Sequence, residues 1–437
     1  MTSSTIEGLA IKIKQFKDLK RTDKLKKTIA EEIAQFTCDL YEKIKKNESL
    51  QIQLAEIAEK LYRALPESAE ILIMQQSAVD YFNSINNDSH SNKNYAFSKK
   101  KDGDQRGTRL QVTQIKKGNS EQQSSTDLYH IKTHSAGSSN RSNSIKSVDL
   151  KELFIYKILA KLGKGPETHF FFNHIFKRGL CIATLDLGHS KPSTTNNTFI
   201  SFEHWIQKRE ANKSKYKNID NDQDSSMRKQ IIALDIISRI FSLTDTTTNP
   251  SNFGCVESSD VKSSAAWKLL DFRLAVDDSD LYYNPEIFQA FQSGSGYESY
   301  KEKGILGSIF NKDNLEKMSL GHKIIKQLSS TLPNWLEETY QEIISYAKNN
   351  AAALRVSSAD FEDLQDYVTA TKNNIQSLLT SFNKKAKTRK LKTHKTSTNL
   401  YTLHGKQSSK NPSTKRLHEN TAEENTAASN IKKSRLT

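Results

Sequence analysis

Over the first 85 residues, apolar side chains recur every three or four positions, which is the spacing of one face of an α-helix. Residues that commonly cap helices, such as Thr22, Asp23 and Ser49, precede the periodic runs. The pattern predicts a small antiparallel helical bundle over residues 1–85. A packing module is the simplest interpretation, and partner binding or bracing of an adjacent lobe is the alternative. The predicted helices run from Ile6 to Leu19, from Thr22 or Asp23 to Lys45, from Ser49 onward and from Pro66 onward.

The pattern changes after this bundle. Residues 86–107 are polar and without period, which is typical of a linker. From Arg109, apolar and polar residues alternate in LQVTQI and again in LYHIKTH, as they do in β-strands. In the second of these strands Leu128, His130 and Lys132 share one face. The polar stretch KKGNSEQQSST lies between the two strands and predicts a turn or a flexible loop.

A helix and two further strands complete the region from residue 108 to residue 187. Ser147 or Asp149 is the expected N-cap of the helix VDLKELFIYKILAKLG, and Gly163 is the expected stop. THFFFNHI and LCIATLDL predict two strands joined by the turn FKRG. The region therefore predicts an antiparallel sheet with one inserted helix. The helix follows the third strand if 110–115 forms two short pieces or if a further strand precedes it.

Residues 188–383 are expected to be mainly helical. FISFEHWIQKRE predicts a short helix, and residues 210–227 form a charged insert. RKQIIALDIISRIFSL is apolar on more than one side, as in a buried central helix. A polar loop and two short strands, 253–256 and 267–270, follow it. Three amphipathic helices are predicted to complete this half of the chain, namely Asp313–Ser329, Pro333–Ala352 and Ser358–Asn383.

Composition narrows the class of protein. Only 35% of the 437 residues are hydrophobic, and the mean hydropathy of −0.68 indicates that part of the chain is linker or tail. The 16 glycines leave little material for a glycine-rich dinucleotide-binding fold. The chain has an odd number of cysteines, and they are widely spaced at Cys38, Cys181 and Cys255. This pattern favours a reducing compartment over a disulfide scaffold or a structural zinc site.

Charge is concentrated at the C-terminal end. Residues 384–437 carry 14 Lys/Arg and 3 Asp/Glu, so their net +11 leaves +4 of the chain's +15 for all other residues. We expect this basic tail to be disordered. Its clusters Lys415–Arg416 and Lys432–Arg435 resemble a bipartite nuclear-import signal, which implies an import receptor as a partner, and Lys384–Lys395 is a further cluster. A solubilising tail that binds nucleic acid without sequence preference is the alternative.

No apolar run reaches the roughly 18 residues that a membrane-spanning helix needs. The first residues, MTSSTIEGLAIKIKQFKDLK, lack the apolar core of a signal peptide. We therefore expect a soluble intracellular protein without a membrane span, with the nucleus as one candidate location.

Polar residues that suggest chemistry recur at the ends of the predicted elements. Lys132 lies in the strand YHIKTH and Glu152 in the helix VDLKELFIYKIL. Asp245 ends the central helix, Asn252 precedes a strand, and Asp271 ends the strand WKLLD. Between about residue 105 and residue 350, this order resembles the protein-kinase-like fold, and in particular its atypical branch of phosphoinositide kinases and HipA-type kinases.

The resemblance implies an α+β, bilobal kinase-like fold. The small lobe of antiparallel sheet plus helix would be residues 108–187, and the larger helical lobe would be residues 188–383. The N-terminal helical bundle, the linker and the disordered basic tail would lie outside the two lobes.

The resemblance also implies ATP and Mg²⁺ as cofactors, and a protein or a lipid-like hydroxyl as acceptor of the γ-phosphoryl group. Lys132 would contact the α- and β-phosphates, and Glu152 would hold it. Asp245 would accept or orient the proton of the attacking hydroxyl, while Asn252 and Asp271 would bind the metal ion. Gly118 and Ser120 would cover the phosphates. All of the side chains Lys132, Glu152, Asp245 and Asp271 should then converge on one cleft.

Several features depart from the family pattern. Asp245 and Asn252 are seven positions apart where the family has five, so that Asn249 is an alternative metal ligand. Asp149 is a less favoured substitute for Glu152. Arg273 stands where the family has glycine, and no G-x-G-x-x-G is present. A catalytically inactive pseudokinase scaffold is therefore the alternative to an enzyme, and nucleic-acid binding through the basic tail is a third hypothesis.

Overall fold

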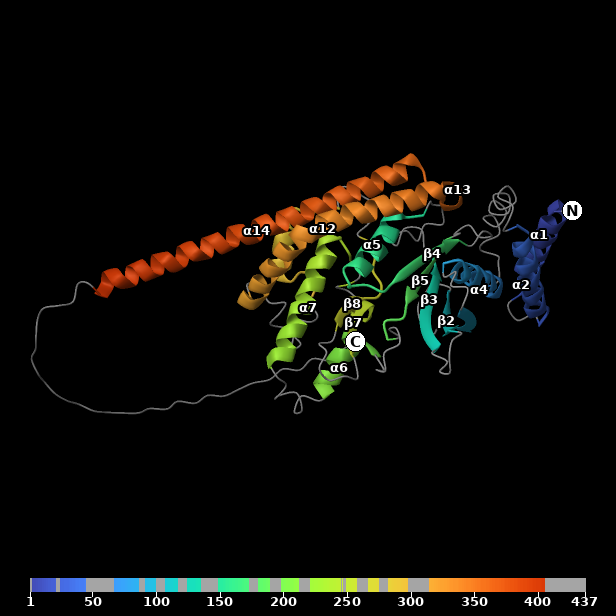
Figure 1. Ribbon diagram of the computed structural model, residues 1–437, viewed down its shortest axis with the longest axis horizontal. Coiled ribbons are helices and arrows are strands. Elements are labelled where there is room, and N and C mark those ends of the chain that lie inside the picture. Colours follow the sequence, from blue (N-terminus) through green and yellow to red (C-terminus); the bar gives the residue numbers. More distant parts are fainter. Residues whose placement is uncertain are drawn as a thin grey trace, which may run out of the picture. The chain divides into compact units, whose positions relative to one another are not determined.

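The computed structural model describes most of the elements that this pattern predicts. The described residues are 2–20, 24–44, 67–85, 91–99, 107–116, 124–134, 148–172, 180–188, 198–211, 221–244, 246, 249–257, 266–274, 282–297 and 314–404. The chain divides into two compact units, residues 1–384 and residues 385–437. The first unit is a mixed α+β structure with small antiparallel sheets (Figure 1).

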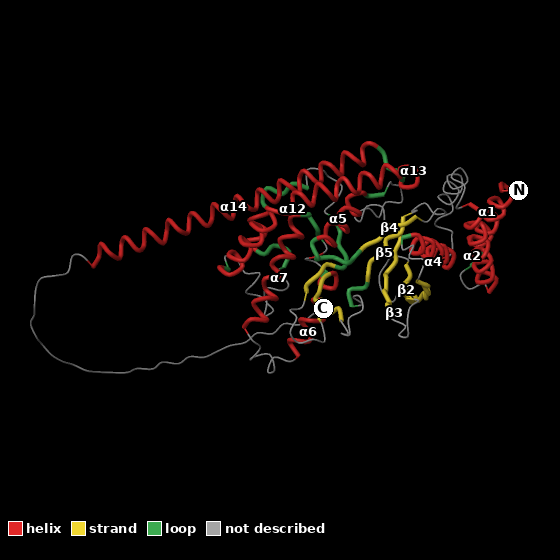
Figure 2. Tube along the Cα trace, viewed as in Figure 1, coloured by secondary structure: helices red, strands yellow, loops and turns green. Residues whose placement is uncertain are grey.

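The larger sheet has five antiparallel strands in the order β1-β2-β3-β5-β4 (Figure 2). Strands β2 to β5 overlap the four stretches that were predicted to be strands. Strand β1 corrects the prediction of a linker at 86–107. In SNKNYAFSK only Tyr95 and Phe97 are large and apolar, and as an edge strand it half-buries one face while the other stays exposed. The strands are Ser91–Lys99 (β1), Gly107–Lys116 (β2), Ser124–Thr133 (β3), Thr168–Phe172 (β4) and Leu180–Leu185 (β5).

Helix α4 (Glu67–Ser84) packs on one face of this sheet. Its apolar side chains form one core cluster with residues from β2 to β5. Because successive residues of a strand face opposite sides, Tyr129 and Ile131 of β3 join this cluster, while His130 and Lys132 face away from it. The helix predicted from Pro66 onward is therefore packed against the sheet. Helices α1 (Thr2–Asp18) and α2 (Lys24–Ile44) precede it, and α2 contacts α4. The cluster comprises Met74, Ala78, Phe82, Leu110, Val112, Tyr129, Ile131, Phe171, Cys181 and Ala183.

Helix α5 (Leu150–Lys161) forms as predicted. The side chain of Asp149 accepts a hydrogen bond from the amide of Lys151, which confirms Asp149 as the N-cap. Gly163 follows the helix with φ of +65°, a left-handed conformation that glycine adopts without strain. Most of the helix is buried, so its position relative to β3 is held by the core.

A second sheet of three antiparallel strands, in the order β6-β7-β8, contains the predicted hairpin. It is built from β6 (Thr198–Ser201), β7 (Phe253–Glu257) and β8 (Ala266–Leu269). The stretch predicted as one short helix is divided into β6 and helix α6 (Phe202–Ala211). At Gly254, a Cβ atom would lie 2.1 Å from the carbonyl oxygen of Ile200, so the close approach of β6 and β7 requires glycine.

The helices of the remaining part differ from the prediction at their ends. Helix α7 (Asn221–Ile240) begins inside the predicted insert 210–227. Helix α12 (Leu315–Asn349) runs through Pro333, where two helices were predicted. The neighbouring Leu332 and Leu336 are fully buried, and this packing offsets the hydrogen bond that proline removes. Shorter elements here are η3 (Pro250–Asn252), α9 (Ile287–Ser293) and α13 (Ala351–Leu354).

Helix α14 (Ser358–His404) corrects the prediction that disorder begins at Lys384. Its continuation KKAKTRKLKTHK is rich in Lys and also contains Arg, Leu and Ala, all of which have high helix propensity. Near its start α14 lies beside α12, joined by the pair Lys372–Glu337 (Figure 1). The predicted import clusters at 415–416 and 432–435 lie outside the described residues. Among the helices that the structure describes, none is both long and apolar enough to cross a bilayer.

Candidate functional site

Three of the predicted side chains meet in one place. Nζ of Lys132, on β3, lies 3.9 Å from Oε1 of Glu152 in the first turn of α5. The same Nζ lies 3.4 Å from Oδ1 of Asp271, which follows β8. Lys132 and Asp271 are 139 positions apart in the chain, so the fold brings them together. We refer to Lys132, Glu152 and Asp271 as the charged cluster.

The three members of the charged cluster differ in exposure. The side chain of Glu152 is 6% exposed and that of Lys132 17%, whereas that of Asp271 is 58% exposed. Burial lowers the pKa of Lys132, but the Tyr156 phenol and the two carboxylates raise it by more, and the resulting pKa lies above its ordinary value. Lys132 is therefore a fixed positive charge at every physiological pH.

Glu152 has a second partner that the sequence did not single out. Nε2 of His134 lies 3.0 Å from Oε2 of Glu152, and both side chains are buried. Burial raises the pKa of Glu152, but His134 and Lys132 together lower it below its ordinary value. Each carboxylate oxygen of Glu152 thus faces a nitrogen of another side chain, one from Lys132 of β3 and one from His134 directly after β3. The available signal was the strand period, which places residues 132 and 134 on one face.

The segment after Asp271 is held against α5 and the end of α7. The amide of Phe272 donates a hydrogen bond to Oδ1 of Asp271. The ring of Phe272 is buried and lies 4.7 Å, centroid to centroid, from the ring of Tyr156 on α5. Leu274 forms a β-bridge with Leu243, next to α7. These contacts hold the backbone of Asp271 while its carboxylate remains exposed.

The two candidate metal-binding asparagines, Asn249 and Asn252, make different contacts. Oδ1 of Asn249 accepts the amide of Ser251 and caps η3. The carbonyl oxygen of Asn252 accepts the amides of Leu270 and Asp271, at 2.7 and 3.3 Å. The backbone of Asn252 is therefore directly beside that of Asp271, and Asn252 is the better candidate for a shared ligand.

Three other predicted site residues, Asp245, Gly118 and Ser120, lie outside the described residues. Asp149, the alternative partner for Lys132, instead caps α5 and lies 3.5 Å from Nζ of Lys151. Asp149 therefore has a structural role as the N-cap of α5 and is not a member of the charged cluster.

Within the residues that the structure describes, no group of three or more His, Cys, Asp or Glu side chains could hold a metal ion. Mg²⁺ does not need such a group, because it is usually bound by one or two protein oxygens together with substrate phosphates and water. The exposed carboxylate of Asp271, with Asn252 beside it, fits that donor set.

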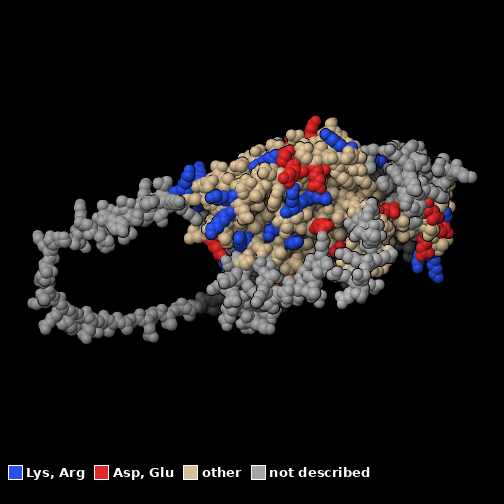
Figure 3. Space-filling model, in the orientation of Figure 1, with Lys and Arg blue, Asp and Glu red and all other residues tan. Residues whose placement is uncertain are grey.

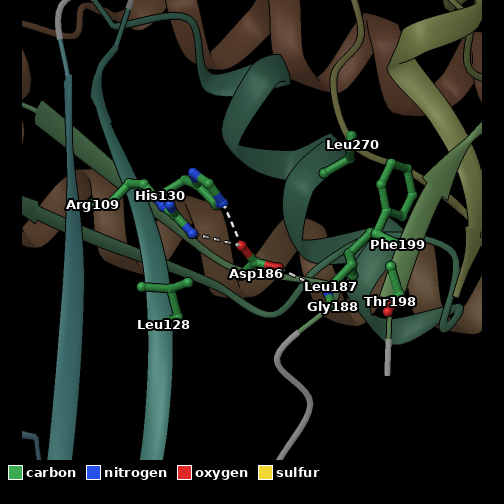
Figure 4. Close-up of a pocket in the computed structure, with 9 residues that line it drawn as sticks. All are labelled: Arg109, Leu128, His130, Asp186, Leu187, Gly188, Thr198, Phe199 and Leu270. Carbon is green, nitrogen blue, oxygen red and sulfur yellow. Dashed lines mark hydrogen bonds and ion pairs between the residues drawn. The ribbon is translucent and has the colours of Figure 1, made fainter. Parts of the chain in front are cut away.

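Figure 4 shows a pocket of about 410 Å³, and two of its lining residues are close in sequence to members of the charged cluster. Leu270, in its wall, directly precedes Asp271, and His130 is two positions before Lys132 on the same strand face. Apolar side chains and a polar group around Asp186 line it. The sequence did not single out this pocket, because its residues come from β2, β3, β6 and two strand ends. They are Arg109, Leu128, His130, Asp186, Leu187, Gly188, Thr198, Phe199 and Leu270.

Asp186 is the centre of the polar group. Its Oδ2 lies 2.8 Å from Nε2 of His130 and 3.6 Å from Nη2 of Arg109. Its Oδ1 accepts the amide of Gly188 at 2.8 Å. Burial raises the pKa of Asp186, but these neighbours lower it by more than burial raises it. The carboxyl is therefore ionised at neutral pH.

No protein family model, no curated protein and no solved structure matches this chain. We therefore infer the function of the chain from two features of its structure. One is a buried lysine between a buried and an exposed carboxylate. The other is a largely apolar pocket with one charged side.

Proposed function

We propose that the chain is an atypical kinase-like phosphotransferase with a bilobal fold, and that it moves the γ-phosphoryl group of a nucleoside triphosphate to a hydroxyl group. ATP is the donor that the resemblance implies, and the acceptor would be a protein or a lipid-like molecule. The observation that carries the proposal is the meeting of Lys132, Glu152 and Asp271 at 3.9 and 3.4 Å. This is the set that a kinase needs around the nucleotide phosphates.

The buried side chains explain how Lys132 would act. An ammonium held by Glu152 is already in place when a nucleotide arrives, so little ordering is needed on binding. Its charge would stabilise the α- and β-phosphates in a site of low dielectric, where Coulomb interactions are stronger than in water. The nucleotide would replace Asp271 as the second partner of Lys132.

Asp271 and Asn252 would hold Mg²⁺ together with the phosphates. When bound, the ion supplies positive charge that offsets the charge of the transferring group. The pocket beside Leu270 would receive the base, because its apolar walls suit a planar ring and Leu270 directly precedes Asp271. Asp245 would orient the acceptor hydroxyl. It follows Thr244, whose amide donates to the carbonyl oxygen of Arg273 at 2.9 Å.

One observation favours a pseudokinase scaffold as the second candidate. Arg273 follows Phe272 in place of glycine, and a residue with a side chain has less backbone freedom there. A scaffold of this kind would bind a nucleotide without turnover. Nucleic-acid binding through the basic residues 384–437 is the third hypothesis; residues 405–437 lie outside the described residues, and the described part of the face drawn in Figure 3 carries both basic and acidic side chains.

The test is phosphoryl release or transfer by the full chain with Mg²⁺ and a γ-labelled nucleoside triphosphate. The wild type is compared with Asp245→Ala and Asp271→Asn, and Asp366→Asn, an exposed position of α14, is the matched control. We expect turnover by the wild type and the control, and its loss in both site variants. Equal activity in all four proteins would exclude the catalytic assignment. Binding without turnover would favour the scaffold.

A further inference from the structure

The pocket beside the charged cluster has one charged side that a purely apolar base site would not need. Arg109 of β2 and His130 of β3 both approach Asp186, which follows β5 (Figure 4). Three separate strands thus contribute to one polar group. A ligand in this pocket would meet hydrogen-bonding groups on that side and the apolar Leu128, Phe199 and Leu270 elsewhere.

Arg109 keeps hydrogen-bonding capacity in this arrangement. Its Nη2 lies 3.6 Å from Oδ2 of Asp186, which is longer than a hydrogen bond. Among the described residues its Nε has no hydrogen-bond partner, although the atom is buried. A buried donor without a partner is costly. The guanidinium therefore fits a ligand that brings acceptors, and its planar fork suits two adjacent ones.

Asp186 keeps capacity as an acceptor. Its Oδ2 faces His130 and Arg109, and its Oδ1 takes the amide of Gly188. An ionised carboxylate has about four lone-pair positions, so at least one remains on Oδ1. Arg109 and Asp186 thus present donors and an acceptor on the same side of the pocket.

We propose that this pocket selects guanine, so that a guanosine nucleotide is the preferred phosphoryl donor over an adenosine nucleotide. The inference rests on the proposed function and names its donor. Guanine carries adjacent O6 and N7 acceptors, which match an arginine fork, and N1–H and N2–H donors, which match a carboxylate. Adenine places its N6 donor beside N7, where it opposes Arg109, and its N1 acceptor opposes Asp186. The volume of about 410 Å³ is within the usual range for small-molecule sites.

The test is titration of the full-length protein, with Mg²⁺, by guanosine, inosine and adenosine diphosphates, which bind without turnover. We expect the guanosine nucleotide to bind roughly tenfold more tightly than the adenosine nucleotide. Inosine diphosphate keeps O6, N7 and N1–H and lacks only the N2 amino group, so its affinity should lie close to that of guanosine diphosphate.

The variant Arg109→Met removes the donors but keeps an apolar stem. We expect it to weaken guanosine diphosphate roughly tenfold and to leave adenosine diphosphate nearly unchanged, which abolishes the preference. Arg228→Met is the control, because Arg228 pairs with Glu316 on the surface of α7 and is not part of the pocket. If Arg109→Met does not fold, Arg109→Lys keeps the charge without the fork and should lose the same preference.

Tighter or equal binding of the adenosine nucleotide by the wild type would overturn the inference and leave the proposed phosphotransferase intact. Equal weakening of both nucleotides by Arg109→Met would overturn it as well. If the folded wild type bound none of the three nucleotides, both the inference and the proposed function would fail.

Discussion

The two carboxylates beside Lys132 belong to regions of opposite character. Glu152 is 6% exposed in a buried helix and is faced by Lys132 of β3 and by His134, which follows β3. Asp271 is 58% exposed at a strand end and meets only one of them, Lys132. The difference shows that proximity to Lys132 does not by itself identify the role of a carboxylate. Glu152 has the environment of a group that holds the site, and Asp271 that of a group that can bind a ligand.

The largest effect on stability is expected from Glu152→Gln. Removing this charge leaves Lys132 without its buried counter-charge, and breaking such a buried pair costs about 3–5 kcal/mol of unfolding free energy. Urea unfolding followed by tryptophan fluorescence measures the loss. Glu316→Gln, at an exposed pair with Arg228, is the control and should change the free energy by less than about 1 kcal/mol. A loss as small as that in the control would contradict the contrast.

Asp271→Asn should show the reverse behaviour. Its unfolding free energy should change by less than about 1 kcal/mol, because the Lys132–Asp271 pair is exposed on the aspartate side. Turnover with Mg²⁺ should nevertheless fall by about a hundredfold or more, because a metal ligand supplies several kcal/mol of charge stabilisation. Unfolding curves and initial rates on the same preparations separate the two effects. Strong destabilisation with normal turnover would show that Asp271 is the structural carboxylate.

A smaller effect is expected from His134→Gln, which tests whether Lys132 and His134 together hold Glu152 in position. The variant should lose about 1–3 kcal/mol of unfolding free energy, since Oε2 of Glu152 is left without its closest partner. Nucleotide affinity should fall with it, because Glu152 then competes for Lys132. His322→Gln, at an exposed contact with Asn383, is the control and should change neither quantity. An affinity equal to that of the wild type would show that Lys132 does not depend on this contact.

The smallest expected effect is a change of the unfolding free energy with pH, whose direction follows from the pKa of Glu152. The pKa of Glu152 is lowered in the fold, so the stability from its ionised form is fully present above its unfolded pKa of about 4.3. That contribution is lost as the pH falls through the folded pKa, which is lower. The difference in unfolding free energy between wild type and Glu152→Gln should therefore shrink as the pH falls below about 4. A difference that grows as the pH falls below about 4 would contradict the direction of this shift.

Local patterns in the sequence predicted part of this structure. Alternation and capping were sufficient for β3, for α5 with Asp149 and Gly163, and for the β7–β8 hairpin. The proximity of Lys132, Glu152 and Asp271 was implied by the resemblance to the kinase-like fold, and it is found. Their roles in phosphoryl transfer, and those of Asp245, Gly118 and Ser120, remain predictions.

Other features depend on contacts that no local pattern records. Strand β1 is polar and is fixed by pairing with β2, and α12 is continuous at Pro333 because its flanks are buried. Arg109 and Asp186 are 77 positions apart and meet only when the sheet is formed. The pocket was missed for the same reason, since each of its residues alone resembles an ordinary strand or loop residue.

The most direct test of the central claim is calorimetric titration of guanosine and adenosine diphosphates, with Mg²⁺, into wild type, Lys132→Met and Lys372→Met. Lys372 is an exposed lysine of α14 paired with Glu337 and serves as the matched control. If the charged cluster is a phosphate site, wild type and control should bind alike, and Lys132→Met should bind at least about tenfold more weakly, because one charge-assisted contact is worth roughly 1.5–3 kcal/mol. Equal affinity of all three proteins for both nucleotides would contradict the account.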